Sequence, residues 1–338
     1  FYDIDMLYPS DEEVKEYFAS YKPDVVGLSA VVSTSYSQVK RISSIIRKEL
    51  PNCWIVMGGN LSACSEAVLK STNIDLSVVG DGEIAWIKIL NHIMENPDRN
   101  NFQSKMKLEE VRGVAFLDKD KKINLNGFAQ AIPAEDQVYP DYKLLKSGLK
   151  DRPEEFNNYL KVASETHWFG FDDRAKDKNR GKNIGQIFSS KGCVARCTFC
   201  QRSTKGFRVQ PLEHLENHLK FLKKNYDVGY IQILDENFGS NKKHAYQVAD
   251  ILHKHNLLWF AAGIRCTSTN RDDLKYYKER GCSALKYGVE SGSQKILDMM
   301  EKVFSIKDVY NALSSCIEIG IHAPMAVMVG VVGSMSAF

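Results

Sequence analysis

The chain has 338 residues, of which 43% are hydrophobic and 26% charged, and its formal net charge at pH 7 is +3. This composition suits a globular protein of about two domains, and it is not basic enough for a dedicated nucleic-acid-binding protein. The longest near-continuous apolar run, Ala323–Val332, is far too short to cross a bilayer, so we expect no membrane span and interpret the run as a buried parallel strand. The eight cysteines are too sparse for a disulfide scaffold, and we expect a reducing cytoplasm as their setting.

From Tyr2 to about Met94 the sequence alternates short apolar runs with amphipathic stretches. The apolar runs predict strands at Tyr2–Met6, Val25–Ser29, Trp54–Met57 and Leu76–Val79. The amphipathic patterns predict helices at about Asp11–Ser20, Ser35–Leu50 and Ser65–Lys70, and another after Glu83. Because the strands are apolar throughout, the alternation predicts a parallel sheet covered on both faces, with ligands at the carboxyl ends of its strands.

Two of these helices begin with the spacing of a capping box, in which the first side chain and the one three residues later satisfy each other's backbone N–H groups. The pairs are Ser10 with Glu13 and Ser35 with Gln38.

Residues 96–183 have little periodicity, and we interpret them as a connector between two domains. Gly113–Leu117 and Ile123–Leu125, separated by the charged sequence DKDKK, predict a β-hairpin within it. The sequence after Phe171 is dense in charged residues and predicts a mobile loop.

A second alternation of strands and helices begins near Gln186. Strands are expected near Ile187–Ser189, Tyr230–Leu234, Trp259–Gly263, Ala284–Gly288 and Ala323–Val329. Helices are expected at Pro211–Asn225, Lys242–Asn256, Arg271–Arg280, Ser293–Met300 and Ser305–Gly320. Repeated units of this kind predict a barrel or a partial barrel, whose chemistry lies in the loops after the strands.

Three cysteines follow the first strand of this second alternation. The sequence KGCVARCTFCQR places Cys193, Cys197 and Cys200 in the spacing C-x-x-x-C-x-x-C, which indicates an iron–sulfur cluster or another metal. A closed zinc site needs four ligands, and the nearest histidines, His214 and His218, fall on a later helix. Zinc and three unliganded cysteines are therefore the less favoured alternatives. Three cysteines leave one iron of a cubane cluster open to a further ligand.

With Phe199 before the last cysteine, this motif resembles that of the radical S-adenosylmethionine superfamily. The resemblance implies a 4Fe–4S cluster on the three cysteines, with the open iron bound to the amino and carboxylate groups of S-adenosylmethionine. It also implies that one electron cleaves this cofactor to a 5′-deoxyadenosyl radical, which abstracts hydrogen from a substrate.

The same resemblance implies S-adenosylmethionine contacts at the ends of later strands. Asp235, Glu236 and Asn237 follow the second strand and would hold the amino end of the cofactor, although such acids can also cap the following helix. Arg265 follows the third strand and would pair with the cofactor carboxylate, with a surface ion pair as the alternative.

The segment KYGVESGSQKIL after the fourth strand resembles the corresponding segment of cobalamin-dependent members of the superfamily. On this resemblance Glu290 would accept hydrogen bonds from ribose hydroxyls, and Ser291 would lie beside it in the cofactor site. An N-cap role for Ser291 or Ser293 is the alternative reading of the serines.

The amino-terminal sequence carries three strand-end loops in order, within KPDVVGLSAVV, VMGGN and VVGDGE. Their glycines permit close approach of the backbone to a ligand, although such turns also occur without one. A dinucleotide fingerprint would need a third glycine where Ala85 stands, so the sequence does not favour NAD.

The three loops together resemble the cobalamin-binding domain that precedes radical S-adenosylmethionine barrels. The resemblance implies that Ser29, Gly58, Gly59 and Gly80 line the cobalamin pocket. The sequence has no D-x-H-x-x-G, so it offers no histidine as a lower cobalt ligand. Cys53 and Cys64 alone do not fit the cysteine triad of the related methylthiotransferases.

The predicted fold is α/β, with a Rossmann-like cobalamin-binding domain over 1–95, the connector over 96–183 and a partial (β/α)6 radical S-adenosylmethionine barrel over 184–338. The resemblance implies that the first strand of the amino-terminal domain and the sixth strand of the barrel lie outside the sequence.

The function implied is methylation of an unactivated carbon, in which one S-adenosylmethionine methylates cob(I)alamin and a second yields the radical. Cyclisation or rearrangement with the same cofactors, and a non-catalytic iron–sulfur or corrinoid-binding protein, are the alternatives. The electron donor implied is a flavodoxin or ferredoxin, and the substrate is unknown.

Overall fold

The computed structural model describes residues 1–101, 107–149, 152–160, 172, 174, 179, 181–201 and 204–330. The chain divides into two compact units. The amino-terminal unit comprises Ile4–Pro133 with Gln201–Lys205, and the carboxy-terminal unit comprises Phe1–Asp3, Ala134–Cys200 and Gly206–Phe338. Within the described ranges no helix is long and apolar enough to cross a membrane.

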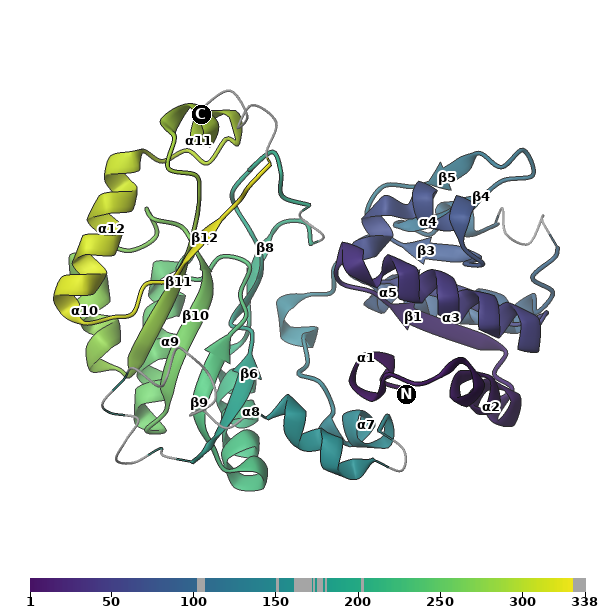
Figure 1. Cartoon of the computed structure of the whole chain (residues 1–338), viewed down its shortest axis with the longest axis horizontal. Helices are drawn as coiled ribbons and strands as arrows, with labels where there is room; N and C mark the ends of the chain where they lie inside the picture. The colour runs from purple at the N-terminus through teal and green to yellow at the C-terminus, as the bar shows by residue number, and fades with distance from the viewer. Residues whose placement is uncertain are drawn as a thin grey trace. The chain divides into compact units, whose positions relative to one another are not determined.

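The amino-terminal unit contains a sheet of five strands in the order β1-β2-β3-β4-β5 (Figure 1). The first three strands are parallel and the last two form an antiparallel hairpin. The strands are β1 Val25–Ser29, β2 Trp54–Gly58, β3 Leu76–Val78, β4 Val114–Leu117 and β5 Ile123–Leu125. The helices between and after the parallel strands are α2 Asp11–Tyr21, α3 Tyr36–Glu49, α4 Ser65–Ser71 and α5 Glu83–Glu95.

The predicted hairpin is therefore present, and it extends the first sheet by pairing with β3. Its buried residues Val114 and Phe116 share one apolar core with Trp54 of β2 and Ile89 of α5. Because this burial holds the hairpin against the sheet, the compact amino-terminal unit runs beyond residue 95 and ends at Pro133.

Two local predictions for this unit are wrong. Tyr2–Met6 is not a strand; Ile4–Leu7 instead forms the one-turn helix α1. A strand is stable only when paired, and among the described residues β1 pairs with β2 alone. The capping box at Ser10 is confirmed, but Ser35 makes no cap because it ends a 3-10 turn and already has helical dihedrals.

The carboxy-terminal unit contains a parallel sheet in the order β12-β11-β10-β9-β6, in which each strand lies beside its neighbour in sequence, as in a barrel. The strands are β6 Asn183–Ile187, β9 Val228–Ile233, β10 Leu258–Ile264, β11 Cys282–Glu290 and β12 Met325–Val327. The helices are α8 Leu212–Tyr226, α9 Lys242–Lys254, α10 Arg271–Glu279, α11 Gln294–Met299 and α12 Ile306–Ile319. A separate antiparallel pair, β7 Ser190–Gly192 and β8 Phe207–Val209, flanks the cysteine loop.

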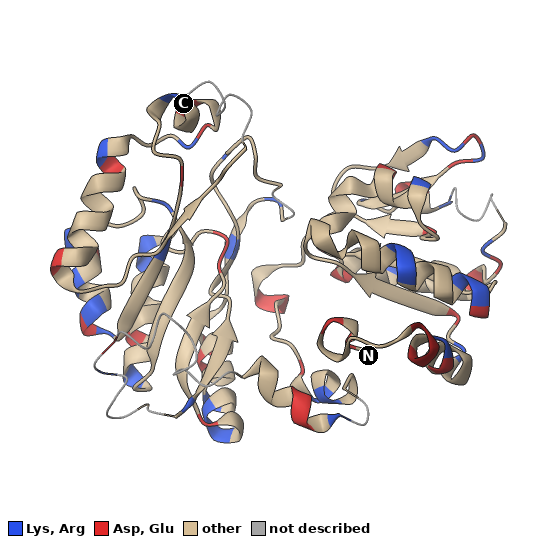
Figure 2. Ribbon diagram, in the orientation of Figure 1, with Lys and Arg blue, Asp and Glu red and all other residues tan. Residues whose placement is uncertain are grey.

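The predicted α/β fold with a partial barrel is thus confirmed. Figure 2 shows charged residues on the helices and loops and very few on the strands, as expected for sheets covered on both faces. The first barrel strand begins at Asn183, four residues before its predicted start.

The prediction that Ala323–Val332 is a buried strand is wrong. Its strand, β12, lies at the edge of the described sheet, where Met325 is 52% and Val327 60% exposed. An apolar run indicates a strand, but it does not fix the strand's position in the sheet. Residues 331 and 332 lie outside the described range, as does most of the charged loop predicted after Phe171.

The described part of the connector after Pro133 packs on α8 through aromatic rings. It contains α7 Tyr142–Ser147 and a 3-10 turn at Pro153–Tyr159. The ring of Tyr139 stacks on His218 with centroids 4.0 Å apart and planes 2° apart, and Tyr142 stacks on Tyr226 at 5.2 Å. These contacts anchor this segment in the carboxy-terminal unit.

The stacked imidazole makes stability depend on pH. Burial lowers the pKa of His218 to about 4, so folding favours the neutral ring. In the unfolded chain a histidine has a pKa of about 6.5, and between these values the unfolded state binds more protons. His218 therefore stabilises the fold at neutral pH, and this contribution is lost as pH falls from about 6.5 towards 4.

We expect the midpoint of thermal unfolding of the apoprotein to fall more between pH 7.5 and pH 5 in wild type than in His218→Phe, which keeps an aromatic ring against Tyr139. The exposed His253 provides the control, since His253→Phe should keep the wild-type pH dependence. An unchanged pH dependence in His218→Phe would contradict this account.

Candidate functional site

The three clustered cysteines lie in the loop between β7 and β8, close to the carboxyl end of β6. Cys197 is buried, Cys193 is half-buried and Cys200 is exposed, and the backbone N–H of Cys200 donates to the carbonyl of Cys197 at 3.1 Å. In the described ranges no three histidine, cysteine, aspartate or glutamate side chains converge as a metal site, so the thiols share one loop without being brought together.

The donor set of this loop nevertheless fits an iron–sulfur cluster. Thiolates are the ligands that such clusters take, and the three sulfurs come from one short loop. A guanidinium nitrogen of Arg265 lies 3.6 Å from the sulfur of Cys197. Arg265 thus places a positive charge beside a sulfur that would be negative as an iron ligand.

The cysteine loop is attached to the carboxyl end of α11. The N–H of Thr198 donates to the carbonyl of Met300 at 3.0 Å, and its hydroxyl donates to the carbonyl of Met299 at 3.3 Å. These bonds fix the middle of the loop between Cys197 and Cys200.

Asp235 follows β9 and ties that strand to the residues just before the loop. Its carboxylate accepts from the N–H and hydroxyl of Ser189, both at 2.6 Å, and from those of Ser190 at 3.1 and 2.7 Å. Burial raises the pKa of Asp235, and the four donors counteract that effect. The contacts of Asp235 are thus to the protein and orient the start of β7.

Glu236 and Asn237, which follow Asp235, differ in whether their side-chain oxygens have a hydrogen-bond partner. Glu236 accepts from the N–H of Gly192 at 3.1 Å, directly before Cys193. Asn237 is only 2% exposed, and its side-chain oxygen has no hydrogen-bond partner in the described structure. Since buried polar atoms are nearly always paired, this unpaired oxygen is what a site for a polar ligand would contain.

Gly263 allows the Asp235–Asn237 segment to approach β10, and the sequence analysis did not identify it. Its φ is +71°, and a Cβ there would lie 2.6 Å from the carbonyl oxygen of Asp235. The register of β10 against β11 shifts at this point. A glycine inside a predicted strand is the sequence signal for such a bulge.

Arg265 and Glu290 are brought to the same region by β10 and β11. Arg265 contacts Cys197 and donates to the carbonyl of Lys302, so it is not the surface ion pair that was the alternative. Glu290 has a φ of 69° and pairs with Lys302 at 3.4 Å. The hydroxyl of Ser291 accepts from the N–H of Ser293 at 3.2 Å. Ser293 is the N-cap residue of α11 but makes no side-chain cap bond, so the alternative capping role is wrong for both serines.

In the amino-terminal unit, an open pocket of about 420 Å³ lies at the carboxyl ends of the parallel strands. Ser29 and Gly58, which are partners in the β1–β2 register, both line it. Apolar side chains of β2 and β3 and the ring of Trp86 form much of its wall. The full set is Gly27, Leu28, Ser29, Val56, Met57, Gly58, Val78, Gly82, Glu83 and Trp86.

The predicted glycines have separate roles. A Cβ on Gly58 would meet no atom within 4 Å, so this residue borders open space. Gly59 has a φ of +81°, and a Cβ there would lie 2.4 Å from the carbonyl oxygen of Ala30. Gly80 has a φ of +110° and lies close to Ala129. Gly59 and Gly80 shape the backbone and do not line the pocket, whereas Trp86, which the sequence analysis missed, does.

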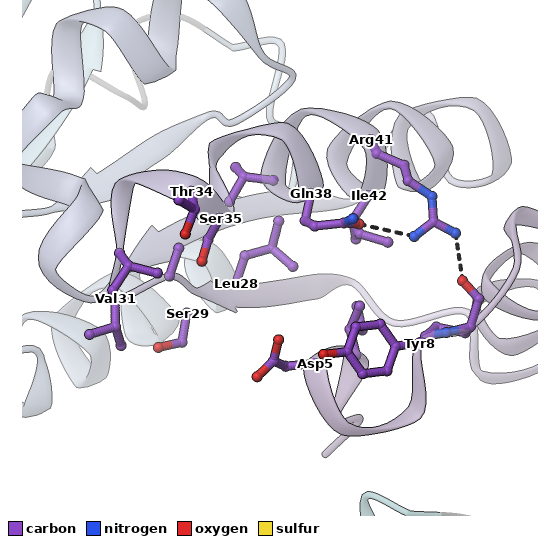
Figure 3. A pocket seen from close by; sticks show the side chains of 15 residues that line it. Asp5, Tyr8, Leu28, Ser29, Val31, Thr34, Ser35, Gln38, Arg41 and Ile42 are labelled. Atoms are coloured by element: carbon purple, nitrogen blue, oxygen red, sulfur yellow. Dashed lines mark hydrogen bonds between the residues drawn. The ribbon is translucent and has the colours of Figure 1, made fainter.

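A second pocket of about 560 Å³ lies along the outer edge of β1 and shares Leu28 and Ser29 with the first. Figure 3 shows Asp5 and Tyr8 across this pocket from α3. The guanidinium of Arg41 binds Asp11 and the carbonyl of Pro9, both at 2.6 Å, and Gln38 at 3.1 Å. The guanidinium of Arg41, which borders this pocket, is therefore already engaged by protein groups. The strand-end pocket is the better candidate for a cofactor site.

Sequence comparisons identify both parts of the chain. Residues 2–89 match the B12 binding domain, and residues 187–334 match the radical SAM superfamily. The cytidylyl-2-hydroxyethylphosphonate methyltransferase of Streptomyces wedmorensis is 22% identical over 335 residues, covering 93% of this chain and 59% of its own length. The anaerobic magnesium-protoporphyrin IX monomethyl ester cyclase of Rubrivivax gelatinosus is 24% identical, covering 95% of this chain and 53% of its own.

A solved structure supports the fold. The radical S-adenosylmethionine methyltransferase TsrM from Kitasatospora setae, with cobalamin and a [4Fe-4S] cluster bound, matches with a TM-score of 0.69 at 17% identity. The match covers 95% of this chain and 61% of TsrM. The chain thus spans less than two thirds of the length of each of these three proteins.

Proposed function

Because the chain belongs to the radical S-adenosylmethionine superfamily and carries a B12 binding domain ahead of the barrel, we propose that it is a cobalamin-dependent radical S-adenosylmethionine enzyme that methylates an unactivated carbon. The observation that carries this proposal is that each unit has a site suited to one cofactor. The barrel unit has the three-cysteine loop beside Arg265, and the amino-terminal unit has a largely apolar pocket at the ends of its strands.

In the barrel unit, Cys193, Cys197 and Cys200 would hold the 4Fe–4S cluster. Asn237 would offer its unpaired oxygen to the amino end of S-adenosylmethionine, and Glu290 would accept from its ribose. Arg265 would supply positive charge to the cofactor carboxylate.

The remaining residues of the predicted site would support these contacts. Asp235 and Glu236 would hold the backbone before the cysteine loop, and Ser291 would fix the turn after Glu290.

In the amino-terminal unit, Ser29, Gly58 and Trp86 would contact cobalamin, while Gly59 and Gly80 would shape the loops. When bound, the cluster supplies the electron that cleaves S-adenosylmethionine, and the corrinoid supplies the methyl group. The apolar walls of the pocket would exclude water from the bound corrinoid.

A second candidate is cyclisation with the same cofactors and without methyl transfer. The similarity to an anaerobic cyclase over 95% of this chain favours it as the alternative. For either reaction we infer a reducing cytoplasmic setting, which suits the eight free cysteines, and a flavodoxin or ferredoxin as electron donor.

The test uses protein purified without oxygen and loaded with cluster and cobalamin. It is given a strong reductant, S-adenosylmethionine labelled in its methyl group, and a small-molecule extract of the cells that encode it. We expect labelled methylcobalamin, 5′-deoxyadenosine and an extract component that gains the labelled methyl group. A product that loses hydrogen without gaining label would favour cyclisation, and S-adenosylmethionine cleavage with no labelled corrinoid or product would contradict methyl transfer.

A further inference from the structure

Lys302 is a buried cation that the proposed roles do not use. It lies between α11 and α12 and is only 4% exposed. Its amine is 3.4 Å from a carboxylate oxygen of Glu290, whose side chain is 12% exposed. Removing a lysine from water is costly unless the charge is compensated, so the Glu290 carboxylate accounts for the burial of Lys302.

The same residue contacts the cysteine loop and its neighbours. Its carbonyl accepts from Arg265, the side chain that lies beside Cys197. Its amine lies over the rings of Phe199 and Phe304, with distances of 5.6 and 5.3 Å to the ring centroids. Lys302 thus joins, through one residue, the predicted ribose acceptor, the predicted carboxylate partner and the loop of the cluster cysteines.

The backbone is strained around this ion pair. Glu301 and Val303 have φ values of 52° and 54°, on either side of Lys302, and Glu290 has a φ of 69°. Residues other than glycine rarely adopt this region, and a β-branched residue such as Val303 is especially disfavoured there. Such strain persists only where the surrounding structure enforces it, and it concentrates at functional sites.

Gly288 leaves the space that the ion pair occupies. It lies two residues before Glu290 on β11, where the register of β11 against β12 shifts. A Cβ on Gly288 would lie 2.8 Å from the carboxylate oxygen of Glu290 and 3.5 Å from the amine of Lys302. The absence of a side chain at this position therefore lets the carboxylate bend towards the lysine.

Packing alone does not explain a buried lysine and glutamate here. Replacing a buried ion pair by apolar side chains is often neutral or stabilising, so holding the α11–α12 segment in place does not require charges. What the pair achieves, and an apolar contact would not, is a Glu290 carboxylate pointed in one direction.

We propose that Lys302 is a positioning residue that holds the Glu290 carboxylate in the orientation in which it accepts from the ribose of S-adenosylmethionine. This inference rests on the proposed function, since it concerns how the same cofactor site recognises its nucleoside. Lys302 itself does not contact the cofactor; it acts through Glu290.

The experiment measures binding without turnover. Protein carrying the reconstituted cluster is dialysed without reductant against S-adenosylmethionine and against its 2′,3′-dideoxyribose analogue. Wild type should prefer the natural cofactor by at least about tenfold, as expected for a hydrogen bond to a charged acceptor. Glu290→Gln should lose most of this preference.

Lys302→Met should reduce the preference to below about threefold, and Lys302→Arg should restore it in part. In the Glu290→Gln background, Lys302→Met should have no further effect on the preference, because its action passes through the carboxylate. The exposed Lys307 provides the matched control, and Lys307→Met should bind both ligands as wild type does.

Gly288→Ala provides a second variant in case Lys302→Met lowers the folded fraction. The atoms nearest to its added Cβ are the flexible ends of Glu290 and Lys302, so the fold should persist while the preference falls. The absorbance of the cluster, recorded for each variant, checks that the iron site is intact.

The outcomes separate this inference from the proposed function. Suppose that wild type binds S-adenosylmethionine more tightly than the analogue, while Lys302→Met keeps the full preference or weakens the binding of both ligands equally. The positioning role of Lys302 is then wrong, and the proposed function stands. If wild type carries the cluster but does not bind S-adenosylmethionine, both are overturned.

Discussion

Replacing Cys197 by alanine is expected to reduce the iron bound after anaerobic reconstitution from about four atoms per chain to near zero. Cys197 is the central ligand of the predicted triplet, and its sulfur is the one that Arg265 approaches at 3.6 Å. Two cysteines on a loop cannot hold a cubane cluster against a reducing solution. Iron and sulfide analysis, with the visible absorbance of the cluster, makes this measurement.

Cys64→Ala is the matched control, because Cys64 is an exposed thiol in the amino-terminal unit. It should take up iron as wild type does. If Cys197→Ala kept a full cluster, or if Cys64→Ala lost it, the assignment of the metal site would be wrong.

A leucine in place of Gly58 is expected to weaken cobalamin binding by at least about tenfold, or about 1.4 kcal/mol. Gly58 borders the open strand-end pocket, and a Cβ on it meets no atom within 4 Å. The new side chain therefore starts in open space, and we expect it to occupy the space that the corrinoid would need. Equilibrium dialysis against hydroxocobalamin measures the affinity.

The neighbouring Gly59 gives the contrasting variant. Alanine at this position must adopt a φ of +81° with its Cβ 2.4 Å from the Ala30 carbonyl oxygen, so it should destabilise the amino-terminal unit by about 1–3 kcal/mol. The thermal midpoint should fall in Gly59→Ala and stay unchanged in Gly58→Leu. Wild-type cobalamin affinity in Gly58→Leu would show that the pocket is not the corrinoid site.

Local sequence signals predicted most elements of both units. The amphipathic patterns gave α2, α3, α8, α9, α10 and α12 within a few residues, since a buried stripe and its caps are encoded locally. The prediction of a capping box at Ser10 is confirmed for the same reason. The motif of Cys193, Cys197 and Cys200 was visible because all of its ligands lie in one short segment.

Two of the errors arose where distant contacts decide the structure. Tyr2–Met6 has an apolar pattern compatible with a strand, but it lacks a pairing partner in the described sheet and turns into α1. The strand near Ala323 was placed correctly, but its exposure depends on its place at the sheet edge. No local rule reveals either condition.

Two site residues were missed in the sequence for the same reason, because distant contacts decide where their side chains lie. Trp86 reaches the strand-end pocket from the first turn of α5, and Lys302 reaches Glu290 from a linker twelve residues further along the chain. In the sequence, each looks like an ordinary residue of a helix or its end. Only the fold brings these two residues to the candidate cofactor sites.

The most direct test of the central claim is whether the reconstituted protein cleaves S-adenosylmethionine. Wild type and Cys197→Ala are incubated anaerobically with dithionite and S-adenosylmethionine, with and without cobalamin, and 5′-deoxyadenosine is quantified. We predict 5′-deoxyadenosine from wild type and none above background from Cys197→Ala. A wild-type protein that carries a full cluster and yet forms no 5′-deoxyadenosine would contradict the assignment of radical chemistry to this chain.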